Sequence, residues 1–351
     1  MTRKAKLIYV GLAVCLIASM LAFSCAQPAP APSPAPAPSP APTPTPAPKP
    51  EPVELKLVAC MPWNLLDKFS TPWFVERVEK YSNGELLIDF VGGPEACPAF
   101  EQPAAISNGV FDITVNWVGM YKPELPEVAA IELSRLNGVE ERESGLYDLM
   151  VESHKKKKQY YLGKGASSNL SYWLYLNFPV NTPSDIAGHK FGSVGTKGKR
   201  FAEALGAVDV VIDWPELYPA LERGVIDGSP YCVSGIVEEA HGEVVNYIIK
   251  HNFYNDGTVY LMNLDKWNSL PANLQKVLTD VMMSIEQDAV ARDQIFIDSC
   301  WEKFTAEGGE IITFSPSDAE WYVNLAYDVE WEALKPQIPE SLYDKLRAAA
   351  E

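Results

Sequence analysis

The feature that most constrains the fold is a stretch of sequence that occurs twice. Residues 101–117 read EQPAAISNGVFDITVNW and residues 216–232 read ELYPALERGVIDGSPYC. When the two copies are aligned, similar residues pair as Ala105/Ala220, Ile106/Leu221, Gly109/Gly224, Val110/Val225 and Asp112/Asp227. In each copy a helix with one apolar face ends at a glycine, and a short β-branched run follows. Copies so far apart do not form a solenoid. They predict two similar α/β lobes that offer strand ends to a shared crevice, where open α/β sheets bind ligands. Chance similarity is the alternative.

Residues 1–25 have the composition of an export signal. Three basic residues precede an uncharged apolar run over residues 7–23, and this order favours a secretory signal peptide over a membrane span. The run ends Leu-Ala-Phe-Ser-Cys at Cys25, which resembles the lipobox of bacterial lipoproteins, although the second and third of these residues fit it imperfectly. We therefore expect lipidation of Cys25. Ordinary cleavage near Ala26 and an uncleaved anchor are the alternatives.

Residues 26–52 form a linker that consists almost only of Pro, Ala, Ser and Thr. Such a composition cannot bury a core, and proline favours the extended polyproline II conformation. The linker is therefore predicted to be a semi-rigid spacer that lifts a globular body off a membrane surface. A ligand for a proline-recognition module is the alternative.

The rest of the chain is long enough for two lobes with hydrophobic cores. Strand and helix patterns alternate from residue 54 to residue 116, which favours a parallel α/β sheet, and a second series follows over residues 190–232. Residues 271–304 carry one uninterrupted helical pattern, long enough to run along both lobes. We assign residues 53–170 plus 257–296 to lobe I and residues 171–256 plus 297–351 to lobe II.

The formal net charge of −17 at pH 7 argues against nucleic acid or an anionic membrane surface as a partner. Four cysteines follow Cys25, and their spacing matches no zinc site. An exported protein permits disulfides, so Cys60 and Cys97 form a candidate pair. Buried free thiols are the alternative.

Motifs of the common enzyme classes are absent from the sequence. The four histidines show no HExxH or triad context, and there is neither a GxSxG elbow nor a P-loop. Glu238, Glu239, His241 and Glu243 are close enough in sequence to form a metal site on a helix. A solvent-exposed acidic helix is the favoured interpretation of this segment. We therefore expect no enzyme and no cofactor. The alternative is a surface-anchored enzyme or adhesion module on a proline-rich stalk.

Six short motifs follow one another along the body of the chain. They occupy residues 82–93, 106–112, 182–190, 205–207, 216–228 and 263–271. In this order they resemble the motifs of the solute-binding proteins of TRAP transporters, the DctP family. The resemblance implies a two-lobed periplasmic-binding-protein fold with a long helix bridging both lobes. It also implies a location in the periplasm or on the outer face of the cell membrane, a small organic solute, and delivery of that solute to TRAP permease subunits.

The chain departs from this family at residues that contact the solute. The family's third motif is followed by an arginine that holds a solute carboxylate in a bidentate pair, and here Gly192 stands in its place. The family's second basic solute contact corresponds to Tyr172 in this chain, and one of its polar solute contacts corresponds to Tyr231. The usual anion clamp is therefore missing, and with it the inference that the solute is a simple carboxylate. Arg200 is a candidate replacement for the missing cation.

The side chains left near the expected crevice are mostly aromatic. Aromatic rings supply apolar area and a polar handle, and they stack on flat or sugar-like solutes. Ordinary core packing is the alternative for each ring, and Asp112 and Asp227 are expected to bond to nearby backbone. The candidates for solute contact are Trp63, Asn116, Trp117, Tyr172, Gly192, Trp214, Tyr231 and Arg200.

Overall fold

The computed structural model describes residues 51–165, 170–193, 198–255 and 257–351. The predicted signal peptide, the predicted lipidation site Cys25 and nearly all of the linker lie outside these ranges. Within them, no helix combines the length and the apolar character that crossing a membrane requires.

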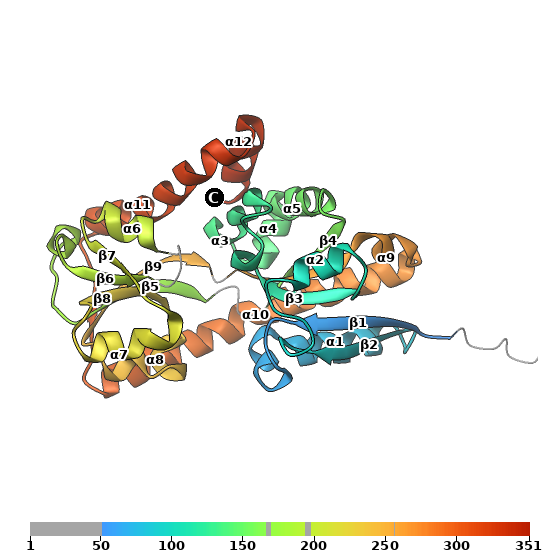
Figure 1. Cartoon of the computed structure of the whole chain (residues 1–351), viewed down its shortest axis with the longest axis horizontal. Helices are drawn as coiled ribbons and strands as arrows, with labels where there is room; N and C mark the ends of the chain where they lie inside the picture. Colours follow the sequence, from blue (N-terminus) through green and yellow to red (C-terminus); the bar gives the residue numbers. More distant parts are fainter. Residues whose placement is uncertain (1–50, 166–169, 194–197, 256) are drawn as a thin grey trace, which may run out of the picture. The chain divides into compact units, whose positions relative to one another are not determined.

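Two mixed β-sheets organise the described part of the chain (Figure 1). The first has the order β2-β1-β3-β10-β4 and consists of β1 (Val53–Ala59), β2 (Leu86–Gly92), β3 (Ile113–Trp117), β4 (Gln159–Lys164) and β10 (Thr258–Asn263). The second has the order β11-β9-β5-β8-β6-β7 and consists of β5 (Ser171–Leu176), β6 (Lys190–Ser193), β7 (Val208–Val211), β8 (Gly228–Cys232), β9 (Tyr247–Asn255) and β11 (Glu310–Ile312). The predicted parallel start is confirmed, because β1 pairs in parallel with β2 and β3.

Helices connect these strands and pack on both sheets (Figure 1). They are α1 (Thr71–Tyr81), α2 (Gln102–Ser107), α3 (Ala129–Leu133), α4 (Gly138–Ser144), α5 (Leu146–Lys155), α6 (Lys199–Ala204), α7 (Leu217–Glu222), α8 (Gly235–Glu238), α9 (Leu264–Ser269), α10 (Ala272–Ala306), α11 (Pro316–Leu334) and α12 (Glu340–Ala349).

The repeated stretch forms the same local structure in both sheets. Helix α2 precedes Gly109 with φ +71°, and α7 precedes Gly224 with φ +66°. Each glycine thus adopts the left-handed conformation that the sequence predicted. An asparagine amide then donates to a carbonyl of the last helical turn, over 2.8 Å from Asn263 in the first copy and 3.2 Å from Asn177 in the second.

The paired aspartates bind backbone, as expected. The Asp112 carboxylate accepts a hydrogen bond of 2.8 Å from the backbone N–H of Lys56, and the Asp227 carboxylate accepts one of 2.8 Å from that of Lys190. Each aspartate also donates its own N–H to the carbonyl of the same lysine. Both copies therefore attach the segment that enters their strand to a parallel neighbouring strand, which is β1 for β3 and β6 for β8.

Helix α10 takes part in the hydrophobic cores of both sheets. Its first half contributes Val281 and Ile285 to the core around β1 and β3. Its second half contributes Trp301 and Phe304 to the core around β5 and α7. Because one rigid helix is buried in two cores, it braces both lobes, as the uninterrupted pattern predicted (Figure 1).

Two elements are not evident from the sequence patterns described above. Residues 138–155 form two helices rather than one, because Gly145 between α4 and α5 has φ +87°. Strand β9 was not anticipated, because Lys250, His251 and Asn252 interrupt its apolar pattern. These three residues lie where the pairing of β5 with β9 shifts register, so they form a bulge rather than an alternating strand.

The C-terminal helix α12 packs against α5, which leads into the first sheet. The Ser144 hydroxyl donates to the Ala349 carbonyl over 2.7 Å, and the Arg135 backbone N–H donates to the Ala350 carbonyl over 2.9 Å. The boundaries assigned to lobes I and II did not anticipate this contact, and they stay a prediction.

Buried ion pairs join α4, β4 and α10. The Arg142 guanidinium lies 2.5 Å from the Glu286 carboxylate, and the Lys164 ammonium lies 2.5 Å from the Glu141 carboxylate. Glu286 also accepts a hydrogen bond of 3.0 Å from the Lys164 backbone N–H. A Cβ at Gly163 would lie 2.3 Å from the Glu286 carboxylate, so a glycine is needed there for this contact to form.

Candidate functional site

The predicted site residues of the first sheet lie at one edge. Strands β1 and β3 are parallel neighbours, so their carboxyl ends lie side by side. Trp117 is the last residue of β3, and Trp63 begins the 3₁₀ helix Trp63–Phe69 that follows β1. Trp63 is 44% exposed, and its ring centroid lies 4.8 Å from that of Phe90. These two tryptophans therefore present aromatic surface at the same strand ends.

Asn116 precedes Trp117 in β3 but is fully buried. Its Nδ2 donates to the Ala99 carbonyl over 2.8 Å, and its Oδ1 accepts from the Trp117 backbone N–H over 2.8 Å. Neighbouring residues of a strand point to opposite faces. In this structure the Asn116 amide thus binds backbone groups of the protein, and its contact with a solute stays a prediction.

Tyr172 and Tyr231 come together in the second sheet. They lie on the antiparallel neighbours β5 and β8, and their ring centroids are 6.4 Å apart. Both side chains are half-buried. The Tyr231 ring also packs edge-on against His241, with centroids 4.7 Å apart. A fixed ring with a remaining exposed face is suited to stacking on a solute.

Gly192 lies on β6, and its surroundings leave no room for a side chain. Its carbonyl accepts a hydrogen bond of 2.7 Å from the Ser229 hydroxyl. A Cβ on Gly192 would lie 2.5 Å from Cδ1 of Ile226, 3.2 Å from Cγ1 of Ile212 and 3.3 Å from Cδ1 of Leu217. Apolar side chains therefore fill the direction in which any residue other than glycine would begin.

Arg200 lies on α6, and its guanidinium pairs with the Glu330 carboxylate of α11 over 2.9 Å. Burial raises the pKa of Glu330, while the positive charge of Arg200 lowers it. Arg200 thus compensates a carboxylate within the protein. The backbone of Trp214 starts a 3₁₀ helix, Trp214–Glu216, but its side chain lies outside the described part of the structure.

Sequence reasoning did not identify the role of His241. It was grouped with three glutamates on one helix, but α8 ends at Glu238 and Ala240 has φ +56°. Within the described ranges, no three His, Cys, Asp or Glu side chains are placed to hold a metal ion. His241 is only 2% exposed and supports the Tyr231 ring. No spacing in the sequence indicates this contact.

All four cysteines of the described part, Cys60, Cys97, Cys232 and Cys300, are buried, and none of them forms a disulfide. The candidate pair Cys60 and Cys97 is therefore not a disulfide in this structure. Both residues are buried thiols, which was the alternative expectation. Burial raises the pKa of the Cys97 thiol, which lowers its reactivity.

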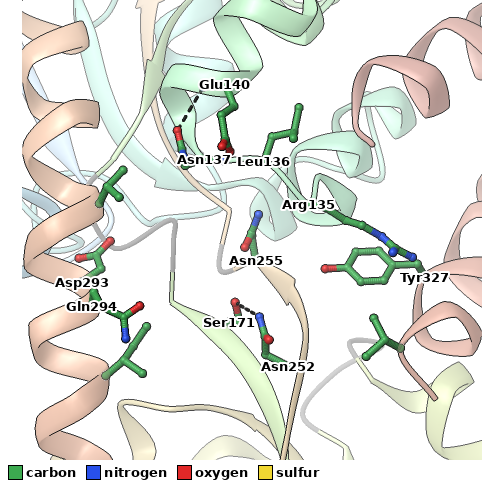
Figure 2. A pocket seen from close by; sticks show the side chains of 13 residues that line it. Arg135, Leu136, Asn137, Glu140, Ser171, Asn252, Asn255, Asp293, Gln294 and Tyr327 are labelled. Carbon is green, nitrogen blue, oxygen red and sulfur yellow. Dashed lines mark hydrogen bonds between the residues drawn. The ribbon is translucent and has the colours of Figure 1, made fainter. Parts of the chain in front are cut away.

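A cavity of about 380 Å³ lies beside β9 (Figure 2). No predicted solute residue with a described side chain lines it. The predicted solute residues Trp63 and Trp117 of the first sheet and Tyr172 and Tyr231 of the second therefore lie outside this cavity.

Comparison with known proteins gives consistent results. A family model described as bacterial extracellular solute-binding protein, family 7, matches residues 70–329. The C4-dicarboxylate-binding periplasmic protein DctP of Rhodobacter capsulatus is 24% identical over 225 residues, which are 60% of this chain and 64% of that protein. This chain therefore spans less than two thirds of the length of that relative.

Solved structures with the same fold cover most of the chain. A TRAP periplasmic solute-binding protein from Ochrobactrum anthropi superposes with a TM-score of 0.74 at 18% identity, over 86% of this chain and 95% of that one. Another, from Desulfovibrio salexigens with bound orotic acid, has a TM-score of 0.68 at 18% identity, over 84% and 97%. The predicted α/β, two-lobed fold with a bridging helix is thereby confirmed.

Proposed function

Because this chain belongs to the family of bacterial extracellular solute-binding proteins, family 7, we propose that it is the extracytoplasmic receptor of a TRAP-type transporter. It closes two lobes on a small organic solute and delivers that solute to permease subunits in the membrane. The observation that carries the proposal is the family match over residues 70–329. Members of this family bind solutes and are not enzymes, so the role is transport rather than catalysis.

The solute is proposed to be held mainly by aromatic and hydroxyl contacts, not by an arginine clamp. Three observations support this: apolar side chains crowd Gly192, Glu330 compensates Arg200, and the rings of Tyr172 and Tyr231 lie close together. A carboxylate buried without a cation is costly. Simple dicarboxylates should therefore bind weakly, although the relative from Rhodobacter capsulatus is named for binding them.

A thermal-shift screen of a broad metabolite library tests the proposed function. A molecule that binds only the native protein raises the apparent melting temperature in proportion to the logarithm of its concentration. We expect saturable shifts with a solute that carries hydroxyl or amide groups, and no chemical turnover of it. Turnover of the shifting compound would contradict the receptor role.

Replacing Trp117 or Tyr231 with alanine should weaken solute binding by about 1–3 kcal/mol each, the usual cost of losing a stacking aromatic. Calorimetric titration with the solute from the screen measures the change. Trp321→Ala is the matched control, because Trp321 lies on α11 and is 51% exposed. If Arg200→Ala instead abolishes binding and C4-dicarboxylates bind tightly, Arg200 is the replacement cation and the aromatic proposal is wrong.

Gly192→Arg should not create a carboxylate site. Its Cβ would overlap Ile226, so the variant should lose about 1–3 kcal/mol of unfolding free energy, as overpacked cores do. Urea unfolding measures the loss, and titration with succinate measures any gained affinity. A variant that keeps the parental stability and gains succinate binding would contradict this prediction. It would show that the fold can accept an arginine at position 192 and use it to bind a carboxylate.

We further propose that Cys25 is lipidated and that the linker holds the body away from the membrane. Lipobox-type anchoring needs more than one acyl chain, because a single chain binds only marginally. Mass spectrometry of membrane-extracted protein should find a diacylglyceryl-modified peptide that starts at Cys25. A released product that starts at Gln27 would exclude this anchor.

A further inference from the structure

The cavity of about 380 Å³ lies at the crossing between the two sheets. Its walls come from the segment that enters α4, from β5 and β9, from the middle of α10 and from α11. In Figure 2, Asp293 and Gln294 lie on α10 at one side, Arg135 and Tyr327 lie at the other, and Asn255 lies between them. A volume of this size suits a small organic molecule.

Strand geometry separates this cavity from Tyr172, and Tyr231 lines neither this cavity nor the one beside it. Ser171 lines it, and both Ser171 and Trp173 line an adjoining cavity of about 330 Å³. Tyr172 stands between them in β5, so its side chain points to the opposite face of the strand. The outer side of β9 is open here, because β11 pairs only with its first residues, Tyr247 to Ile249. The cavity is therefore behind the strands, away from Tyr172.

Charged groups of both signs lie in the wall. Arg135 donates to the neutral Asn324 amide oxygen over 2.9 Å and lies over the Tyr327 ring at 4.5 Å. Asp293 lies 3.2 Å from the Arg292 guanidinium, and Glu140 also lines the cavity. An ion of either sign would therefore meet a like charge in the wall as well as an opposite one, whereas an uncharged ligand avoids that repulsion.

Neutral polar groups remain to contact a ligand. The Asn252 amide reaches Ser171 over 3.0 Å through Nδ2, and the Asn255 amide reaches the Ser134 carbonyl over 2.7 Å through Nδ2. The carbonyl oxygens of both side chains are still available as acceptors, and the Gln294 amide adds to them. Tyr327 supplies an aromatic face. Hydroxyl groups are the complement of such a wall.

The strand behind the cavity is conformationally restrained. Tyr254 has φ +51°, an unusual value for an aromatic residue, and its hydroxyl donates to the Ala326 carbonyl of α11 over 2.6 Å. Gly257, two residues beyond Asn255, has φ +75°. The chain passes from the second sheet to the first through these residues, so they lie at one of the places where a movement between the sheets would bend the chain.

We propose that this cavity is a second ligand site, for a small uncharged polyol, and that filling it disfavours closure of the lobes on the solute. A ligand here contacts walls attached to both sheets and stabilises the arrangement seen in this structure. A ligand that prefers one conformation weakens any ligand that requires the other. This coupling rests on the proposed receptor function, but the site itself does not.

The test blocks the cavity covalently and uses xylitol as the probe. Gln294→Cys labelled with a bimane reagent places a bulky group in the cavity, since Gln294 lines it. Ile295→Cys with the same label is the control, because Ile295 is the next residue on α10, is 71% exposed and does not line the cavity. The described native cysteines are buried, and the parent protein treated with the reagent gives the background.

Xylitol should raise the melting temperature of the parent and of the labelled control with a saturable component. Excluded polyols stabilise any protein without saturation, and only this linear part should remain in the labelled Gln294→Cys protein. The same protein should bind the transported solute about 5–150-fold more weakly, the usual range of such coupling. Absence of a saturable component in the parent, or its persistence in the blocked protein, overturns the site.

Equal solute affinity in both labelled variants overturns the coupling. If no solute binds even the parent protein, the receptor function fails while the xylitol measurements still decide the site.

Discussion

Replacing Glu286 with alanine is expected to lower the free energy of unfolding by about 3–5 kcal/mol. Glu286 is 3% exposed and carries the charge that compensates Arg142. Without it, the guanidinium stays buried beside α10 with no carboxylate, and the Lys164 backbone N–H loses its acceptor. Burial raises the pKa of Glu286, whereas Arg142 lowers it. Urea unfolding at neutral pH measures the loss.

Two variants separate charge compensation from packing. Glu286→Gln keeps the shape and the bond from Lys164 but not the charge, so its loss should be smaller than that of alanine. Asp288→Ala lies on the same helix and breaks an exposed pair with Arg77, which is worth about 0–1 kcal/mol. If Glu286→Ala costs no more than Asp288→Ala, the buried pairs do not stabilise the fold.

Acidification from pH 6.5 to pH 4 is expected to destabilise the protein through two buried histidines. Burial lowers the pKa of His154 to about 4 and that of His241 to about 4. In the unfolded chain a histidine titrates near pH 6.5, so the unfolded state takes up protons that the native state does not. Stability is therefore lost as the pH falls through this window, by about 3 kcal/mol for each histidine.

Differences between variants isolate the histidines from the carboxylates that also titrate in acid. Unfolding of the parent, His154→Gln and His241→Gln should be measured between pH 7 and pH 4. Each variant should lose less stability across the window than the parent does. Both ring nitrogens of His154 have hydrogen-bond partners, Tyr121 over 2.9 Å and the Met150 carbonyl over 2.7 Å, and His154→Gln also changes these bonds. An identical pH dependence in all three proteins would exclude both histidines as the cause.

Local patterns in the sequence determined the parts of the fold that depend on neighbouring residues. The glycines at 109 and 224, the aspartates that follow them and the unbroken pattern of α10 were all identified correctly. Each of these depends on backbone conformation or helical period within a few residues. Strand β9 was missed because its bulge depends on pairing with β5, which lies far away in the chain.

The site shows the same division. The repeat in the sequence placed Trp117 and Tyr231 just past strand ends, and in the structure they are the last residue of β3 and the last but one of β8. It did not show that the Asn116 amide bonds inward, that Glu330 pairs with Arg200, or that Ile226 fills the space beside Gly192. These properties depend on which side chains from distant segments meet. The sequence alone thus determined the family and the strand ends, and the tertiary structure decided what each of those side chains packs against.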